Sequence, residues 1–233
     1  MATVLPLVLV PGLLCSARLY APQIAALWPF GPVTVADHRR DDELIAIAAR
    51  ILTDAPPRFA LAGLSLGGYI AFAMLRLAPD RIAKLALLDT TARADTPEQT
   101  AAREKLIDMA EAGRFADVVD FLTLRYLHRN RHNDEPLKRV VREMAADTGV
   151  ESFVRQQKAI ISRMDSRPLL ETIRCPTMVL VGDGDELTPP ELSKEICTGI
   201  SGARLVVVPD CGHLSTIEKP EAVNAALAEW LGA

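Results

Sequence analysis

The segment G-L-S-L-G at residues 63–67 constrains the fold of this chain more than any other. It follows an apolar run at residues 59–62 and precedes a stretch whose apolar residues recur with helical spacing. A serine between a strand end and a helix start takes a strained backbone conformation, and glycines two residues away on each side make room for it. The segment therefore predicts a strand, a sharp turn and a helix, with the Ser65 hydroxyl exposed at the turn.

Two more polar residues follow strand-like segments later in the chain. Asp185 comes just after the apolar run 178–181, and His213 comes just after the run 204–208. A serine hydroxyl is a poor nucleophile unless a base takes its proton, and a carboxylate can hold that base in the productive tautomer. The order Ser65, Asp185, His213 thus predicts a nucleophile, an acid and a base, with Asp183, Glu186 and Asp89 as rival acids.

Strand and helix signals alternate along most of the chain, which is typical of a parallel sheet covered by helices on both faces. Most candidate strands are continuous apolar runs, as expected for strands buried on both sides. We therefore predict an α/β fold with a mainly parallel sheet of about six strands. The candidate strands are residues 5–10, 33–36, 59–62, 84–88, 178–181 and 204–208.

Residues 95–166 break this alternation and predict an all-helical insertion, here called the cap. Thr96 is a suitable N-cap, followed by proline at the first helical position and Gln99 at the third. Further helical patterns span 116–127, 135–146 and 152–164. We predict a core of residues 1–94 and 167–233 with the cap inserted, all in one structural domain.

Composition narrows the possible partners and location. The 233 residues, 49% of them hydrophobic, suffice for one sizeable core, and the formal net charge of −4 argues against nucleic acid or an anionic membrane as a partner. The apolar run 4–10 lacks the basic start and cleavage site of a signal peptide, and no run is long enough to span a bilayer. Four scattered cysteines predict reduced thiols in a cytoplasmic protein. No oligomeric state is indicated.

Three other histidines have less specific surroundings. His128 and His132 have the i, i+4 spacing that can bind zinc on a helix, but their polar neighbours favour a solvated turn, and we predict no metal and no cofactor. His38, between Asp37 and Arg39, is expected at the surface or rim.

These motifs together resemble the α/β-hydrolase superfamily, especially its small carboxylesterases and enol-lactonases and the esterases of pimeloyl-carrier methyl esters. The resemblance covers nearly the whole chain. It is carried by Val10-Pro11-Gly12-Leu13-Leu14, Gly63 to Gly68, Cys175-Pro176-Thr177, Gly182-Asp183-Gly184-Asp185 with Pro189, and Cys211-Gly212-His213 with Glu218, Pro220 and Glu221.

The resemblance implies roles for particular residues. The spacing to Pro189 favours Asp185 as the acid, and Asp89 is then expected at the cap junction. The backbone N–H groups of Leu13 and Leu66 are implied as the oxyanion hole. Many relatives carry histidine where this chain has Pro11, and larger members carry two leading strands that we do not expect here.

The resemblance also implies a serine hydrolase that cleaves a small or medium carboxylic ester, thioester or lactone through an acyl-serine intermediate. C–C bond hydrolases, amidases and perhydrolases use similar triads and stay as alternatives, as does a catalytically idle binding protein. Apolar cap residues could line a substrate pocket, although packing between cap helices is the more usual role. These residues are Met109, Phe121, Leu122, Tyr126, Phe153 and Ile160.

Overall fold

A six-stranded, all-parallel sheet forms the centre of the protein, which we describe from a computed structural model over residues 5–232. The strand order is β2-β1-β3-β4-β5-β6. This arrangement confirms the predicted fold class. The strands are β1 (Leu7–Val10), β2 (Val33–Val35), β3 (Phe59–Leu64), β4 (Ile82–Leu88), β5 (Thr177–Gly182) and β6 (Arg204–Val208).

The burial of the strands follows from their sequences. Every residue of β1, β3 and β5 is buried, whereas the edge strands β2 and β6 keep partly exposed positions. Continuous apolar runs therefore occupy the strands covered on both faces. The first strand begins two residues later than predicted, and Val4 of the apolar run 4–10 lies outside the described residues.

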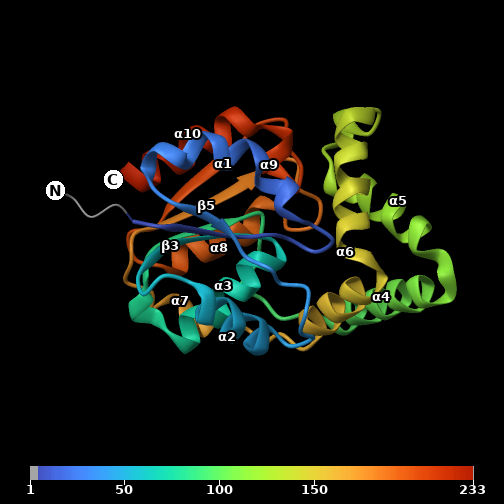
Figure 1. Ribbon diagram of the computed structural model, residues 1–233, viewed down its shortest axis with the longest axis horizontal. Coiled ribbons are helices and arrows are strands. Elements are labelled where there is room, and N and C mark those ends of the chain that lie inside the picture. The colour runs from blue at the N-terminus through green and yellow to red at the C-terminus, as the bar shows by residue number, and fades with distance from the viewer. Residues whose placement is uncertain (1–4, 233) are drawn as a thin grey trace.

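Helices cover both faces of the sheet (Figure 1). On one face lie α1 (Ala21–Leu27), α9 (Ser215–Glu218) and α10 (Pro220–Gly232), and on the other lie α2 (Leu44–Asp54), α3 (Leu66–Leu77), α7 (Arg167–Leu170) and α8 (Pro190–Gly199). Along residues 5–232, no helix is long and apolar enough to cross a membrane.

Between β4 and β5, the helices α4 to α6 lie together at one end of the molecule (Figure 1). This segment contains α4 (Pro97–Met109), a π-helical turn (Ala110–Arg114), α5 (Phe115–Tyr126) and α6 (Glu135–Ile161). The start of α4 is the predicted capping box, with Gln99 N–H donating to the Thr96 hydroxyl and the Thr96 N–H donating to the Gln99 side chain. The two helices predicted at 135–146 and 152–164 are joined in α6 across Gly149, whose φ of 74° makes a kink. The division into a core and a cap stays a prediction.

Candidate active site

Ser65 sits in the sharp turn between β3 and α3 with φ 56° and ψ −115°. This is a strained conformation for a residue with a side chain, and it persists only where the surroundings enforce it. Here the Ser65 N–H donates to the Leu88 carbonyl at 2.9 Å, and the Thr90 hydroxyl donates to the Ser65 carbonyl at 2.8 Å. Leu88 is the last residue of β4 and Thr90 lies two residues beyond it, so the end of the neighbouring strand holds the turn.

The glycines of the turn are required by close backbone contacts. A Cβ on Gly63 would lie 2.2 Å from the Gly67 carbonyl oxygen, and a Cβ on Gly67 would lie 2.0 Å from the Val10 carbonyl oxygen. Neither distance is possible for real atoms without moving the backbone. The G-x-S-x-G spacing is thus explained by how tightly α3 starts against β3 and β1.

His213 reaches Ser65 from the loop after β6. Its Nε2 lies 2.8 Å from the Ser65 Oγ, and its side chain is almost fully buried. The His213 N–H donates to the Tyr126 carbonyl at 2.9 Å, and the two rings stack with centroids 5.8 Å apart. The end of α5 therefore helps to fix the imidazole.

Asp185 holds the other imidazole nitrogen. Its Oδ2 lies 2.8 Å from His213 Nδ1, while its Oδ1 accepts the N–H groups of Leu187 and Thr188, each at 2.9 Å. The Thr188 hydroxyl donates to Oδ2 at 2.7 Å. These donors favour the ionised carboxylate and fix its orientation. The structure thus brings together the three residues expected from the sequence.

The charges of His213 and Asp185 shift the pKa of both residues. Burial acts to lower the pKa of His213, but the facing carboxylate of Asp185 outweighs it and the pKa is raised. Burial acts to raise the pKa of Asp185, but His213 and the Thr188 hydrogen bonds outweigh it and the pKa is lowered. The arrangement therefore stabilises an imidazolium beside a carboxylate.

Among residues 5–232, none of the three rival acids forms a hydrogen bond with His213. Asp183 and Glu186 are exposed. Asp89, expected at the cap junction, is instead fully buried beside β5, where it accepts the Gly182 N–H at 3.0 Å and bonds the Ser215 hydroxyl. That expectation was wrong because Asp89 follows β4 in the middle of the sheet, so its side chain is enclosed. Burial, followed by the charge of Asp185, raises its pKa well above the ordinary value.

Glu218 anchors the histidine loop, a role that the sequence analysis did not assign. Its carboxylate accepts the Gly212 N–H at 3.0 Å and the His128 N–H at 2.8 Å, and the residue is buried. It therefore ties the loop after β6 to the segment after α5. The only signal in the sequence was a glutamate five residues after His213. Its role could not be predicted from the sequence, because it depends on the contact between two segments that are far apart along the chain.

The loop after β1 lies against Ser65, since a Cβ on Gly12 would come 3.4 Å from the Ser65 Cβ. Within residues 5–232, the N–H groups of Leu13 and Leu66 donate no hydrogen bond to the protein. The next residue, Leu14, has a positive φ of 59°. Two free N–H groups near a nucleophile are the kind of donor set that can bind an oxyanion.

Two buried side chains from other parts of the chain hold the loop after β1. Gln156 of α6 accepts the Leu14 N–H at 3.1 Å through Oε1, and its Nε2 lies 3.1 Å from His38 Nε2. His38 Nε2 also lies 2.9 Å from the Gly12 carbonyl oxygen. His38 is therefore buried rather than at the rim as expected, and burial lowers its pKa to about 4. The local sequence around His38 is polar, and its burial depends on α6.

Replacing Gln156 with methionine keeps the volume but leaves the Leu14 N–H without its acceptor. Because the loop geometry should then loosen, we expect kcat to fall on the order of 10-fold to 100-fold with little change in KM, somewhat less than for loss of an oxyanion donor. Steady-state kinetics on an ester substrate measure this. Gln23→Met is the control, since Gln23 is equally buried but bonds Thr216 and Asn224. Equal losses in both variants would contradict the role of Gln156.

His128 is also buried, contrary to the solvated turn expected for it. Its ring packs against Gly184, where an added Cβ would come 2.2 Å from His128 Cδ2. His132 Nε2 lies 3.1 Å from the Leu127 carbonyl oxygen. Over the described part of the chain, no group of three His, Cys, Asp or Glu residues could hold a metal ion.

A cavity of about 480 Å³ opens above Ser65 between the core and the helices α4 to α6. Its volume is in the range of small-ligand sites, roughly 300–1,000 Å³. Of the six apolar residues considered above, Phe153 is fully buried away from the cavity. The other five, Met109, Phe121, Leu122, Tyr126 and Ile160, line it.

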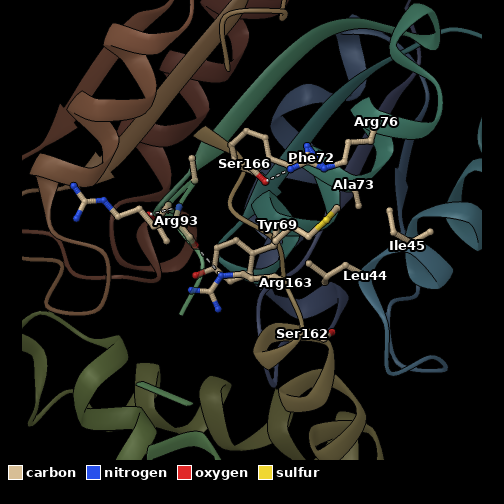
Figure 2. Close-up of a pocket in the computed structure, with 13 residues that line it drawn as sticks. Leu44, Ile45, Tyr69, Phe72, Ala73, Arg76, Arg93, Ser162, Arg163 and Ser166 are labelled. Atoms are coloured by element: carbon tan, nitrogen blue, oxygen red, sulfur yellow. Dashed lines mark hydrogen bonds between the residues drawn. The ribbon is translucent and has the colours of Figure 1, made fainter. Parts of the chain in front are cut away.

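A second, much smaller cavity of about 60 Å³ lies behind Tyr69, which borders both cavities (Figure 2). Arg163, after the end of α6, stacks on the Tyr69 ring at 4.4 Å and donates to the carbonyls of Arg93 and Ile160. Nearby, the Arg76 guanidinium donates to the Ser166 hydroxyl at 3.1 Å (Figure 2). These contacts join the end of α6 to α3 behind the site.

Comparison with known proteins places this geometry in context. A model described as the alpha/beta hydrolase family matches residues 7–226. A pimeloyl-[acyl-carrier protein] methyl ester esterase from Neisseria meningitidis serogroup C is 27% identical, covering 90% of this chain and 86% of that protein.

Two solved structures are similar over nearly the whole chain. A thermophilic esterase from Thermogutta terrifontis is 30% identical with a TM-score of 0.89, covering 97% of this chain and 89% of the other. The enol-lactonase from Burkholderia xenovorans LB400 is 26% identical with a TM-score of 0.89, covering 100% and 93%.

Proposed function

This chain belongs to the alpha/beta hydrolase family, and from that premise we propose that it cleaves a carboxylic ester, thioester or lactone through an acyl-serine intermediate. The observation that carries the proposal is the unbroken relay of 2.8 Å contacts from Ser65 Oγ to His213 Nε2 and from His213 Nδ1 to Asp185. Relatives named as esterases and a lactonase support cleavage of an ester or a lactone.

In the proposed mechanism, Ser65 Oγ attacks the substrate carbonyl carbon as its proton passes to His213 Nε2. The carbonyl oxygen becomes an oxyanion that accepts the N–H groups of Leu13 and Leu66. Collapse of this intermediate breaks the bond to the leaving alcohol or thiol, which receives the proton from His213. A water molecule then attacks the carbonyl carbon of the acyl-serine as its proton passes to His213 Nε2. The bond to Ser65 Oγ breaks, His213 returns the proton to that oxygen, and the acid is released.

Labelling by a fluorophosphonate tests the proposal against the idle-binder alternative. An activated Ser65 should react at neutral pH, and mass spectrometry should place the adduct on the peptide that contains it. Ser65→Ala should abolish the adduct. An unlabelled wild-type protein, correctly folded by circular dichroism, would instead favour a binding protein.

The pH dependence of kcat/KM should follow the protonation of His213. The imidazole accepts a proton only when neutral, so kcat/KM should fall as the pH drops through its pKa. Because Asp185 raises that pKa, the acidic limb should lie above the ordinary histidine value of 6.5. Initial rates at subsaturating substrate from pH 5 to 9 measure it, and a limb centred below 6.5 would contradict the assignment.

The size of the cavity leads us to propose small or medium acyl groups as substrates. A volume of about 480 Å³ cannot enclose a long lipid chain together with the reacting ester. We expect p-nitrophenyl acetate and butyrate to be cleaved with a higher kcat/KM than the palmitate. Faster cleavage of the palmitate below its micelle concentration would show that the cavity does not limit the acyl chain.

We also propose that the protein works in the cytoplasm. The support is chemical, because all four cysteines are unpaired. Reduced thiols persist in a reducing compartment.

A further inference from the structure

Tyr126, the last residue of α5, contacts two separate loops of the active site. Its backbone carbonyl accepts the N–H groups of His213 at 2.9 Å and Leu214 at 3.2 Å. Its ring stacks on the His213 imidazole, with centroids 5.8 Å apart and planes 18° apart. Its hydroxyl donates to the Leu13 carbonyl at 3.1 Å. One residue therefore joins the loop after β6 to the loop after β1.

The Tyr126 hydroxyl is the donor in its contact with Leu13, because a carbonyl oxygen only accepts hydrogen bonds. The side chain is buried, and burial raises the pKa of the phenol well above its ordinary value. The hydroxyl therefore keeps its proton at neutral pH and stays a donor. It acts on the backbone of the residue whose N–H we assign to the oxyanion.

Leu13 is held by hydrogen bonds on both sides, while its own N–H donates to no group within residues 5–232. The carbonyl of the preceding peptide unit lies 2.9 Å from His38 Nε2. In the following peptide unit, the carbonyl accepts the Tyr126 hydroxyl and the N–H donates to Gln156 at 3.1 Å. The next residue, Leu14, has a φ of 59°, a costly conformation that persists only where the surroundings enforce it. The bonds from α5 and α6 supply that restraint.

We propose that Tyr126 is a positioning residue, whose hydroxyl sets the N–H of Leu13 for the oxyanion while its backbone and ring hold the base. Groups that stabilise a transition state must be placed in advance, to within about 0.5 Å. Because one residue contacts both loops, the spacing between the Leu13 N–H and the His213 imidazole depends on α5 as well as on the sheet. This inference rests on the proposed function and adds a residue to its machinery.

Tyr126→Phe tests the hydroxyl alone. The ring and the backbone keep their contacts with His213, and the Leu13 carbonyl keeps the Cys15 thiol at 3.4 Å as a weak donor. We expect kcat on p-nitrophenyl butyrate to fall about tenfold with KM changed less than about twofold, because the oxyanion forms only as the reaction proceeds. The acidic limb of kcat/KM should not move, since the surroundings of His213 are unchanged.

Tyr20→Phe is the matched control. Tyr20 is also buried, its hydroxyl donates to the Val10 carbonyl at 3.0 Å, and it does not line the cavity above Ser65. This variant removes the same kind of bond from the strand that precedes the loop, so kcat should stay unchanged. Thermal unfolding of both variants measures the effect of each lost bond on stability.

A transition-state analogue separates positioning from a general effect on the structure. An alkyl trifluoromethyl ketone should form a hemiketal, as Ser65 Oγ adds to its carbonyl carbon and the Ser65 proton passes to His213. The resulting oxyanion then occupies the place of the one formed in catalysis. In Tyr126→Phe, Ki for this ketone should rise by the same factor by which kcat/KM falls, whereas Ki for the matching methyl ketone should not change.

A double variant tests whether two bonds act on one peptide unit. Tyr126→Phe and Gln156→Met each release one end of the unit between Leu13 and Leu14. Once one bond is lost, the second holds an already loosened loop, so the combined loss in kcat should be smaller than the product of the single losses.

The outcomes separate this inference from the proposed function. An unchanged kcat in Tyr126→Phe, an equal loss in Tyr20→Phe, or losses that multiply in the double variant would overturn the inference alone. A Tyr126→Phe protein that changes mainly KM, or that cannot be purified folded, would overturn it too, since the hydroxyl would then serve binding or stability. If the folded wild-type protein cleaves no p-nitrophenyl ester and resists the fluorophosphonate, the proposed function itself fails.

Discussion

Replacement of Ser65 with alanine is expected to lower kcat about 10⁶-fold, because nucleophile, base and acid act as one unit. The residual rate then comes only from binding and from the N–H groups that face the oxyanion. The fold should survive, because the turn is held by hydrogen bonds between the backbone of Ser65 and residues Leu88 and Thr90, and the Ser65 side chain takes no part in them. Initial rates on a p-nitrophenyl ester, with thermal unfolding in parallel, measure both effects.

A matched control for this variant is Ser193→Ala. Ser193 lies in α8, is fully buried, and its hydroxyl finds no hydrogen-bond partner in the described part of the chain. Its loss should leave kcat unchanged. If Ser65→Ala lost only about tenfold while the purified protein stayed folded, the hydrolysis would have to use another nucleophile.

The fold was predictable because its strongest signals are local. Continuous apolar runs marked most of the six strands, and β1, β3 and β5 are buried along their whole length. The turn at Ser65 was marked by glycines that backbone contacts require. In a parallel sheet the carboxyl ends of the strands share one edge, so the residues after β3, β5 and β6 were expected to meet there. Their catalytic roles stay predictions.

The errors concern residues whose surroundings come from distant parts of the chain. His38 is flanked by Asp37 and Arg39, and only the approach of Gln156, 118 residues later, encloses it. His128 lies in a polar segment, yet its backbone is held by Glu218. No periodicity or spacing encodes such contacts, because each is created where the segment between β4 and β5 packs on the rest of the protein.

The unpaired amide of Gln157 could not be predicted from the sequence either, because its surroundings also come from distant parts of the chain. Gln156 and Gln157 are adjacent and equally buried, but Gln156 accepts the Leu14 N–H of the loop after β1, whereas Gln157 accepts from Arg103 and its Nε2 has no partner within residues 5–232. Neighbouring residues of identical type therefore differ in role only through the elements they meet.

The second large effect expected is that of Asp185→Asn, a loss of about 10⁴-fold in kcat, because asparagine favours the wrong imidazole tautomer and cannot stabilise the imidazolium. Asp89→Asn should cost less than about tenfold. Asparagine keeps an acceptor for the Gly182 N–H and a polar group for the Ser215 hydroxyl, so the buried contacts of Asp89 are preserved.

The pH profile separates these two carboxylates further. Asp185 is the main group that raises the pKa of His213, and Asp89 contributes less. In Asp185→Asn, burial should therefore shift the acidic limb of the residual activity to lower pH, whereas Asp89→Asn should move it only slightly. A modest loss in Asp185→Asn that becomes severe only in the double variant would show that Asp89 can act as the acid. Asp185 would then be the dispensable member of the pair, and the hydrogen bond between Asp185 and His213 Nδ1 would not be what determines the rate.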